Sequence, residues 1–343
     1  MQAVVLDEFG GGFRVEQRVV PEPSDGQVLV EVRAVGAGLT LERARMGVMG
    51  GSTPRVLGHE FSGTVARLGP GAAGWGLGDP VTASFYLFCG RCEWCTSGRE
   101  TLCDRLAGYI GVAVDGAFAE YVAVPAQNLV PIPDGVPLEE AGVVADAVAT
   151  PYHVVTRRLP VVAGQWTAVV GGGGGLGVHM LQMLRAFGAS VIAVERSGEK
   201  AAELERLGLA DVVIQPDGDD WVEEVRVASG DRLVGIVDTV GAVETLAPAV
   251  AALGTSGTLV VLGYRPGSTV TVEANRLLFK EMVVTGTRYA TRAEIAKSLE
   301  LVRQGRVRPL IGARFRLSQL ESAFSAIRGN EVFGRILIDP MDQ

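Results

Sequence analysis

All four cysteines of the 343-residue chain lie in one short segment, with the spacing C-x2-C-x2-C-x7-C. Four thiolates this close together can surround Zn²⁺ as a tetrahedron and leave no coordination position open for a substrate. Two disulfides inside one loop would be a poor cross-link, and the fourth cysteine lies too far along for a typical iron–sulfur motif. We therefore predict one structural zinc ion and chemistry located elsewhere, with the metal ligands Cys89, Cys92, Cys95 and Cys103.

A glycine tract in "VVGGGGGLGVHM" is the second group of residues suited to chemistry. Gly172, Gly174 and Gly177 satisfy the pattern G-x-G-x-x-G. That pattern permits a tight turn, brings backbone close to a pyrophosphate and points the N-terminus of a helix at the anion. We expect a dinucleotide to be held by this tract, through Gly172, Gly174, Gly175, Leu176 and Gly177.

The residues around the tract predict a strand, a turn, a helix and a second strand. A β-branched run at 167–170 precedes the glycines, an apolar stretch with helical period covers 176–187, and a second run at 191–194 ends at Glu195. A carboxylate about 20 residues after the glycines is suited to accept ribose hydroxyls. Glu195 would repel a 2′-phosphate and favours NAD, whereas the adjacent Arg196 could reverse that choice in favour of NADP.

The same alternation continues through "ADVVIQ", "VGIVDTVG", "TLVVLG" and "EMVVTGT". Strands that alternate with helices predict an α/β fold with a doubly wound parallel sheet. The chain before residue 150 has a different texture, with short strands separated by Gly and Pro, as in "QVLVEVRAVGAG". The tail after residue 292 predicts a helix, a proline turn, a second helix and a last strand, "RILID". Two domains are therefore expected.

Composition limits the classes of partner. A net charge of −8 argues against nucleic acid or an anionic membrane surface as the main partner. The first residues, "MQAVVLDEFG", carry no basic and apolar leader, and no uncharged apolar stretch reaches about 18 residues. We expect a cytoplasmic protein that acts on a small molecule and binds neither nucleic acid nor membrane.

The four-cysteine lobe, "LGHEFSGTVARLG", the glycine tract and "GRILID" occur together in this chain. With this combination the chain resembles the zinc-containing medium-chain alcohol dehydrogenases over essentially its whole length. The resemblance implies a GroES-like β-rich catalytic domain from residues 1–150 and 287–343, with the zinc lobe at about 86–106. It also implies an inserted Rossmann domain at 151–286 and a homodimer or homotetramer.

In this family a catalytic zinc has three protein ligands, and the second and third correspond to His59 and Asp146. The first falls in "AGLTLER", where Thr40 stands in place of a cysteine. Glu42 takes the place of the hydroxyl residue that relays the substrate proton, and Arg43 replaces an Asp that supports the zinc-bound histidine. A neutral hydroxyl is a poor substitute for a thiolate, and loss of the supporting carboxylate weakens a site further. We expect the catalytic zinc to be absent.

Hydride transfer belongs to the nicotinamide, and without a Lewis acid two routes remain. The substrate can be activated already, as an enone or an iminium is. Alternatively an acidic side chain can protonate the developing anion, and the available groups are Glu42, His59, Glu60 and Asp146. Glu42 is the first candidate, and an ion pair of Glu42 with Arg43 or Arg45 is an alternative of equal weight.

Three further residues receive roles from the resemblance. Phe85 matches a position that lines the substrate cleft, Gly263 one beside the nicotinamide, and Arg335 an arginine that approaches the cofactor pyrophosphate. An ordinary core aromatic is the alternative for Phe85, and a solvated charge at a strand end is the alternative for Arg335.

The sequence thus predicts an NAD(P)-dependent oxidoreductase that moves a hydride to or from an activated enone, iminium or carbonyl compound without a catalytic zinc. One alternative is an ordinary zinc-dependent alcohol dehydrogenase or ketone reductase, with His59, Asp146 and either water or Glu60 as makeshift zinc ligands. A second alternative is a cofactor-binding protein that catalyses a non-redox reaction in the same cleft.

Overall fold

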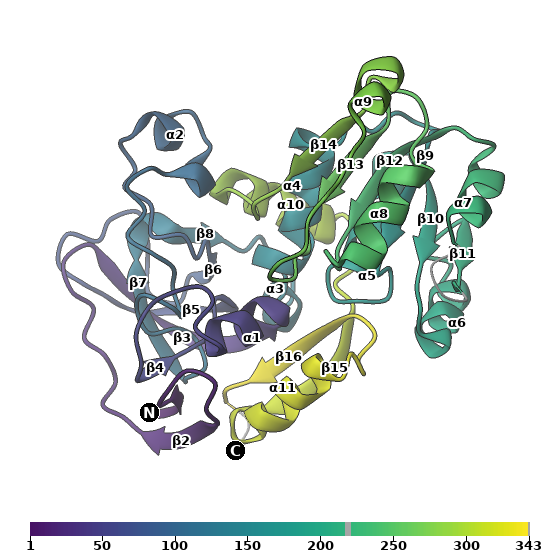
Figure 1. Cartoon of the computed structure of the whole chain (residues 1–343). Coiled ribbons are helices and arrows are strands. Elements are labelled where there is room, and N and C mark those ends of the chain that lie inside the picture. The colour runs from purple at the N-terminus through teal and green to yellow at the C-terminus, as the bar shows by residue number, and fades with distance from the viewer. Residues whose placement is uncertain (217–220, 342–343) are drawn as a thin grey trace. The chain divides into compact units, whose positions relative to one another are not determined.

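The computed structural model describes residues 1–216 and 221–341, and the chain divides into two compact units. The first unit is assembled from 1–149, 289–305 and 311–343, and the second from 150–288 and 306–310. Figure 1 labels the elements of both units. In the part of the chain that is described, no helix combines the length and the apolar character needed to cross a bilayer.

The first unit is built mainly of antiparallel strands. One sheet has the order β2-β1-β4, and a larger sheet has the order β15-β16-β3-β5-β6-β8 with β7 beside β3. The strands are β1 (Gln2–Leu6), β2 (Phe13–Gln17), β3 (Gln27–Ala37), β4 (Arg55–Val56), β5 (Glu60–Leu68), β6 (Pro80–Ala83), β7 (Tyr121–Pro125), β8 (Leu129–Pro131), β15 (Ile311–Arg316) and β16 (Arg335–Asp339).

Short helices connect these strands. They are α1 (Leu39–Arg45), α2 (Glu93–Thr96), η1 (Glu100–Leu102), η2 (Ala126–Asn128), α3 (Leu138–Ala141), the π-helix η3 (Val144–Val148), α10 (Arg292–Arg303), η4 (Leu317–Gln319) and α11 (Leu320–Arg328). The long strand β3 is central because its β-branched side chains are buried along most of its length. The last strand, β16, pairs antiparallel with β3, so the end of the chain lies beside its beginning.

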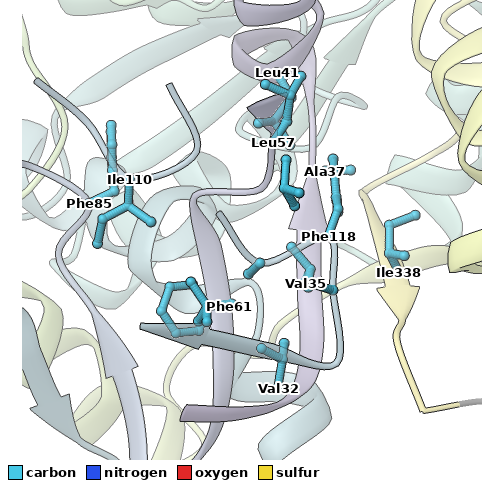
Figure 2. Close-up of a cluster of buried hydrophobic side chains, with 14 of the residues drawn as sticks. Val32, Val35, Ala37, Leu41, Leu57, Phe61, Phe85, Ile110, Phe118 and Ile338 are labelled. Atoms are coloured by element: carbon cyan, nitrogen blue, oxygen red, sulfur yellow. The ribbon is translucent and has the colours of Figure 1, made fainter. Parts of the chain in front are cut away.

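The main core of this unit is a large apolar cluster that joins both sheets and the cysteine lobe. Figure 2 shows part of it, with Val35 of β3, Phe61 of β5 and Ile338 of β16 among the labelled side chains. Phe85 and Ile110 also belong to the cluster. The catalytic candidates of the first unit are therefore attached to a densely packed support rather than to free loops.

The second unit is a parallel sheet with the order β11-β10-β9-β12-β13-β14. The strands are β9 (Trp166–Val170), β10 (Ser190–Val194), β11 (Val212–Ile214), β12 (Leu233–Asp238), β13 (Thr258–Val261) and β14 (Val283–Gly286). The helices are α4 (Ala149–Arg157), α5 (Gly177–Ala186), α6 (Gly198–Arg206), α7 (Trp221–Ser229), α8 (Val243–Ala252) and α9 (Ala274–Lys280).

The order of these strands reverses between β9 and β12, which is the switch point where doubly wound sheets bind dinucleotides. Strand β9 is buried along nearly its whole length, as expected of a parallel strand covered on both faces. Helix α5 ends at Ala186, and Gly188, two residues later, has a positive φ of 93°, which suits the residue after a helix cap. The predicted doubly wound parallel sheet is confirmed.

Candidate active site

A buried ion-pair network lies at the centre of the first unit. Arg335 donates from Nη2 to Glu60 Oε2 at 2.6 Å and to Asp146 Oδ2 at 2.9 Å. The other oxygen of Glu60 accepts the backbone N–H groups of Asp146 and Ala147 at 3.0 and 2.7 Å. All three charged side chains are at most 5% exposed. A buried charge is tolerated when it is paired and hydrogen-bonded in this way.

Two glycines of β3 and its end make room for this network. Gly36 is paired with Glu60 across β3 and β5, and a Cβ at Gly36 would stand 2.2 Å from Glu60 Oε2. A Cβ at Gly38 would stand 2.2 Å from Arg335 Nη1. Any side chain at either position would displace a charged group from its partner. The segment "GAG" at 36–38 is therefore part of the site.

Burial and the neighbouring charges together determine the protonation of Glu60 and Arg335. Burial raises the pKa of Glu60, and the positive charge of Arg335 opposes that rise. Burial lowers the pKa of Arg335, but the negative charges of Glu60 and Asp146 outweigh it and raise the pKa above its ordinary value. Arg335 is therefore a permanent cation in contact with Asp146.

His59 and Phe85 meet this network at Asp146. His59 Nε2 lies 3.4 Å from Asp146 Oδ2, the oxygen that also accepts Arg335. His59 is 2% exposed, and its imidazole contacts the ring of Phe85 in a tilted arrangement with the ring centroids 4.5 Å apart. Three residues named from the sequence, His59, Asp146 and Phe85, are thus brought together.

Thr40 is hydrogen-bonded to a residue that the sequence reasoning missed. Its Oγ1 lies 3.1 Å from the hydroxyl of Tyr289. The ring of Tyr289 meets Phe85 edge to face at 4.8 Å, and its backbone has a φ of 48°, which is uncommon for a residue other than glycine. Burial, with the negative charge of Asp146, raises the pKa of Tyr289, so the phenol stays protonated at neutral pH.

Glu42 points away from Thr40. Residues two apart on a helix do not face the same side, and Glu42 of α1 forms two hydrogen bonds to Arg45, both at 2.8 Å. Arg328 of α11 lies 3.5 Å from the same carboxylate. The hydrogen bonds to Glu42 raise the pKa of Arg45. Of the two alternatives for Glu42, the structure favours the ion pair.

This placement makes Glu42→Gln a test of stability rather than of catalysis. We expect the free energy of unfolding to fall by about 1–3 kcal/mol, because a largely buried charged hydrogen bond is lost. We expect kcat to stay within about threefold of the parent value, since a residue remote from the reacting atoms changes the barrier little. Glu300→Gln, in a more exposed pair with Arg303, is the matched control and should change the free energy of unfolding less than Glu42→Gln does. A 100-fold fall in kcat would restore Glu42 as the acid.

In the second unit, the glycine turn and Glu195 form one hydrogen-bonded group. Gly173 N–H donates to Glu195 Oε2 at 2.9 Å, and Ser197 N–H donates to Oε1 at 3.0 Å. The carboxylate therefore lies directly after β10 with its orientation fixed by backbone donors. Arg196 is exposed, and the side chain of Lys200 is packed against Gly173. Burial lowers the pKa of Lys200, whereas the charge of Glu195 opposes that change.

The glycines of this turn have different tasks. A Cβ at Gly177 would stand 2.1 Å from the carbonyl oxygen of Gly171, whereas a Cβ at Gly174 would meet its nearest atom at 3.5 Å. Gly177 thus permits close packing of helix and strand, and Gly174 leaves the backbone open to a ligand. A Cβ at Gly172 would stand 3.1 Å from the Cβ of Ala193. Gly175 and Leu176 complete the turn before α5. This bare turn with an adjacent carboxylate fits a dinucleotide.

Two substitutions separate these tasks. Gly177→Ala is expected to lower the free energy of unfolding by about 1–3 kcal/mol, because the backbone must move to admit the methyl group. Gly174→Ala is expected to leave stability within ~0.5 kcal/mol but to weaken NADH binding about tenfold or more, because its methyl group would point at the pyrophosphate. Chemical unfolding and NADH fluorescence titration measure the two effects. Equal stability losses for both variants would contradict the assignment.

Gly263 and a buried carboxylate border the same edge of the sheet. A Cβ at Gly263 would stand 2.2 Å from the carbonyl oxygen of Thr239, so the segments after β12 and β13 touch through their backbones. Asp238, at the end of β12, accepts the N–H groups of Val240 and Gly241, each at 2.8 Å. Burial raises the pKa of Asp238. The sequence reasoning missed both Asp238 and Lys200, although each lies beside a residue that it named.

The four cysteines have the spacing of metal ligands rather than of disulfides. Their sulfur atoms lie within 4.8 Å of one another, with separations of 3.5 Å for Cys92–Cys95, 3.8 Å for Cys92–Cys103 and 4.0 Å for Cys89–Cys95. A tetrahedron with Zn–S bonds of about 2.3 Å has edges of about 3.8 Å. A backbone N–H of Arg91 lowers the pKa of Cys89 to about 6, while burial raises that of Cys95 to about 12. The group fits one zinc ion.

Family models match both parts of the chain. The model for the alcohol dehydrogenase GroES-like domain matches residues 24–134, and the model for the zinc-binding dehydrogenase matches residues 175–304. An acryloyl-coenzyme A reductase of Sulfurisphaera tokodaii is 30% identical over 99% of this chain and 100% of its own length. An alcohol dehydrogenase of Geobacillus stearothermophilus is 30% identical over 98% of this chain and 99% of its own length.

The fold agrees with that match. The crystal structure of an NAD-dependent alcohol dehydrogenase superimposes with a TM-score of 0.92 at 30% identity, over 99% of each chain. The GroES-like and Rossmann folds expected from the sequence are therefore confirmed. The chain belongs to the zinc-type medium-chain alcohol dehydrogenase family of NAD(P)-dependent oxidoreductases.

Proposed function

We propose that this oxidoreductase transfers a hydride to the conjugated C=C bond of a small unsaturated carbonyl compound, and that it does so without a zinc ion at Thr40, His59 and Asp146. The observation that carries the proposal is the hydrogen bond between Thr40 and Tyr289, 3.1 Å long. It occupies the one hydroxyl that stands where the family has a thiolate ligand. The acryloyl-coenzyme A reductase named above supports the substrate class, because acryloyl thioesters are conjugated alkenes.

The charges around Asp146 also oppose a second zinc. Zinc sites in proteins use thiolate, imidazole and carboxylate ligands, usually with a net negative ligand set. Here the thiolate is replaced by a neutral hydroxyl, and the carboxylate oxygen nearest to His59 already accepts the Arg335 cation at 2.9 Å. A divalent ion on that oxygen would meet the positive charge of Arg335 directly. The donor set therefore fits a zinc ion poorly.

Conjugated acceptors suit such a site. A bound nicotinamide supplies the hydride. When hydride adds to the β-carbon, the negative charge spreads onto the carbonyl oxygen as an enolate, which is more stable than the alkoxide formed from a simple ketone. A hydrogen-bond donor aimed at that oxygen can then replace the Lewis acid. Phe85 and Tyr289 would provide an apolar surface for the acceptor.

We also infer a preference for NAD over NADP. Backbone donors hold both oxygens of Glu195, so this carboxylate cannot turn away from a 2′-phosphate.

The exposed edge of the Rossmann sheet supports self-association, because β14 lies at the edge and Val283, Leu278 and Phe279 are 48%, 70% and 81% exposed. We infer a homodimer or homotetramer that associates through this edge. Light scattering that finds the mass of a single chain would contradict it.

A panel of matched acceptors tests the proposed reaction. NADH consumption would be followed with conjugated enones and thioesters and with their saturated ketone counterparts, in the presence of EDTA. We expect the conjugated C=C bond to be reduced, the saturated ketones to react at least about 100-fold more slowly, and EDTA to have no effect. Reduction of simple ketones that EDTA abolishes would support an ordinary zinc alcohol dehydrogenase. Bound NADH that no acceptor oxidises would favour the non-redox alternative.

A further inference from the structure

We propose that Tyr289, held by Thr40, is a catalytic residue that donates a hydrogen bond to the substrate carbonyl oxygen while negative charge develops there. The proposal rests on the proposed function, since it names the donor that acts in place of the second zinc. Four observations on the first unit carry it: the protons of the hydroxyl pair, the packing of the Tyr289 ring, the backbone around it and its charged neighbours.

The first observation concerns the two hydroxyl protons. Thr40 and Tyr289 each carry one, and the two oxygens share a single hydrogen bond of 3.1 Å. Among the described residues, neither hydroxyl has a second hydrogen-bond partner. One proton of the pair therefore remains to be donated to a ligand. A phenol is a stronger acid than an alcohol and therefore the better donor to a developing oxyanion. For the state with substrate bound, we assign the donated proton to Tyr289 and the shared proton to Thr40.

The second observation is that the ring of Tyr289 is tightly held. It meets Phe85 at 4.8 Å with an interplanar angle of 86°, and Tyr86 at 5.9 Å with an angle of 66°. Phe85 in turn makes tilted ring contacts with His59 and Tyr109, with centroid distances of 4.5 and 5.7 Å. Edge-to-face contacts of this kind restrict a ring to one orientation. A donor fixed before the substrate arrives costs no reorganisation during the reaction.

The third observation is the backbone at Tyr289. Its φ of 48° lies in the left-handed region, which bulky residues rarely adopt. Directly after it, Thr291 and Glu294 form a capping box that begins α10, and Glu100 accepts the N–H of Arg292 at 2.7 Å. The segment is therefore anchored on its C-terminal side. Unusual backbone conformations persist where the surroundings enforce them, often at functional sites.

The fourth observation concerns the charged groups near the pair of Thr40 and Tyr289. Burial and the negative charge of Asp146 raise the pKa of Tyr289, and the positive charge of Arg43 lowers it. The pair thus belongs to the cluster that contains the family's metal-ligand positions His59 and Asp146. In relatives with a catalytic zinc, the metal at these positions polarises the substrate oxygen. Here a hydroxyl pair takes the corresponding place.

The chemical step balances without another reactant. A hydride from the reduced nicotinamide forms a C–H bond at the β-carbon, and the π electrons of the alkene move to give an enolate. The enolate oxygen accepts the hydrogen bond of Tyr289 and keeps it until a solvent proton adds to the α-carbon. The acceptor gains two electrons and the nicotinamide loses two.

Tyr289→Phe removes the donor and keeps the ring. We expect kcat for a conjugated ketone to fall about 100-fold, the usual effect of deleting one donor to a developing oxyanion. The Kd for NADH should be unchanged. Tyr121→Phe is the matched control, because it deletes a phenol that donates to Glu31 at 2.8 Å on β7, outside the cluster. Thr40→Val should cost about tenfold in kcat, and Thr40→Ser should retain nearly all activity because it keeps the hydroxyl.

A series of acceptors separates catalysis from support of the fold. If Tyr289 stabilises the enolate, the loss in Tyr289→Phe must grow as the acceptor becomes less activated, for example from a nitroalkene to an enone to an unsaturated ester. A purely structural role would lower every rate by the same factor. A loss below about threefold, or an equal loss for all acceptors, would overturn the proposal. If the parent enzyme reduces conjugated acceptors under EDTA and Tyr289→Phe does so equally well, only the role of Tyr289 fails. If EDTA stops the parent enzyme, the proposed function fails instead.

Discussion

Arg335→Met is expected to lower the free energy of unfolding by about 3–5 kcal/mol, the usual cost of removing one partner from a buried ion pair. The guanidinium is the cation that pairs with Glu60 at 2.6 Å and with Asp146 at 2.9 Å, and both carboxylates are at most 1% exposed. Without it, two negative charges would remain buried beside each other. Denaturant unfolding followed by tryptophan fluorescence measures the loss.

Two comparisons make this prediction specific. Arg14→Met removes an exposed arginine that pairs with Asp7 at 2.9 Å, and it should change the free energy of unfolding little, because solvent screens the pair. Adding Glu60→Gln to Arg335→Met should recover part of the stability, because one unpaired charge then disappears. If Arg335→Met were as stable as Arg14→Met, Arg335 would be free of its carboxylate partners, and the charge argument against a second zinc would fail.

Removal of the cysteine-bound metal is expected to unfold its lobe. Helix α2 has four residues and none of them is buried, so the lobe has little apolar core of its own. A zinc ion held by the four cysteines would supply the missing free energy, which amounts to about 10–16 kcal/mol in isolated zinc-finger peptides. In Cys95→Ser we expect zinc to fall from about one ion per chain to nearly none, and amide exchange at 89–103 to speed up at least about 100-fold.

The control for this variant lies in the same lobe. Ser97→Ala changes an exposed residue near the cysteines and should retain both the zinc and the slow exchange. Exchange in the Rossmann unit should be equal in the two variants. Retention of about one zinc ion per chain by Cys95→Ser would show that the metal is held elsewhere.

The parts of the molecule that were predictable from the sequence are those in which the signal is local. The glycine turn, the strand before it and Glu195 all fall within about 30 residues, as in other nucleotide-binding βαβ units. The cysteine spacing is equally local, and four sulfur atoms within 4.8 Å are what it implied. Alternating strands and helices then led to the parallel sheet, which the structure has.

The contacts that define the candidate site are not local. Arg335 is 275 residues from Glu60 and 189 from Asp146, and Tyr289 is 249 residues from Thr40. Each contact depends on tertiary packing, such as the pairing of β16 with β3, and neither periodicity nor a motif encodes it. The closest sequence signal was "GAG" at 36–38, where two glycines leave room for Glu60 and Arg335. Only the pairing register of β3 and β5 shows that Gly36 lies opposite Glu60.

Glu42 shows the limit of reasoning by position. Its place in "AGLTLER" matched a proton relay, whereas the direction of its side chain is set by Arg45, one helical turn later. The sequence allowed Glu42 to be either a proton donor or a member of an ion pair, because it does not show which neighbour the side chain faces. The two hydrogen bonds from Arg45, together with Arg328 of α11 at 3.5 Å from the same carboxylate, favour the ion pair.

The most direct test of the central claim is the zinc content of the fully active protein, measured by mass spectrometry together with turnover of a conjugated acceptor. If a hydroxyl pair and Arg335 take the place of the second metal, the enzyme should contain about one zinc ion per chain and keep its turnover under EDTA. About two zinc ions per chain, with turnover that disappears and returns as the second ion is removed and restored, would contradict the account.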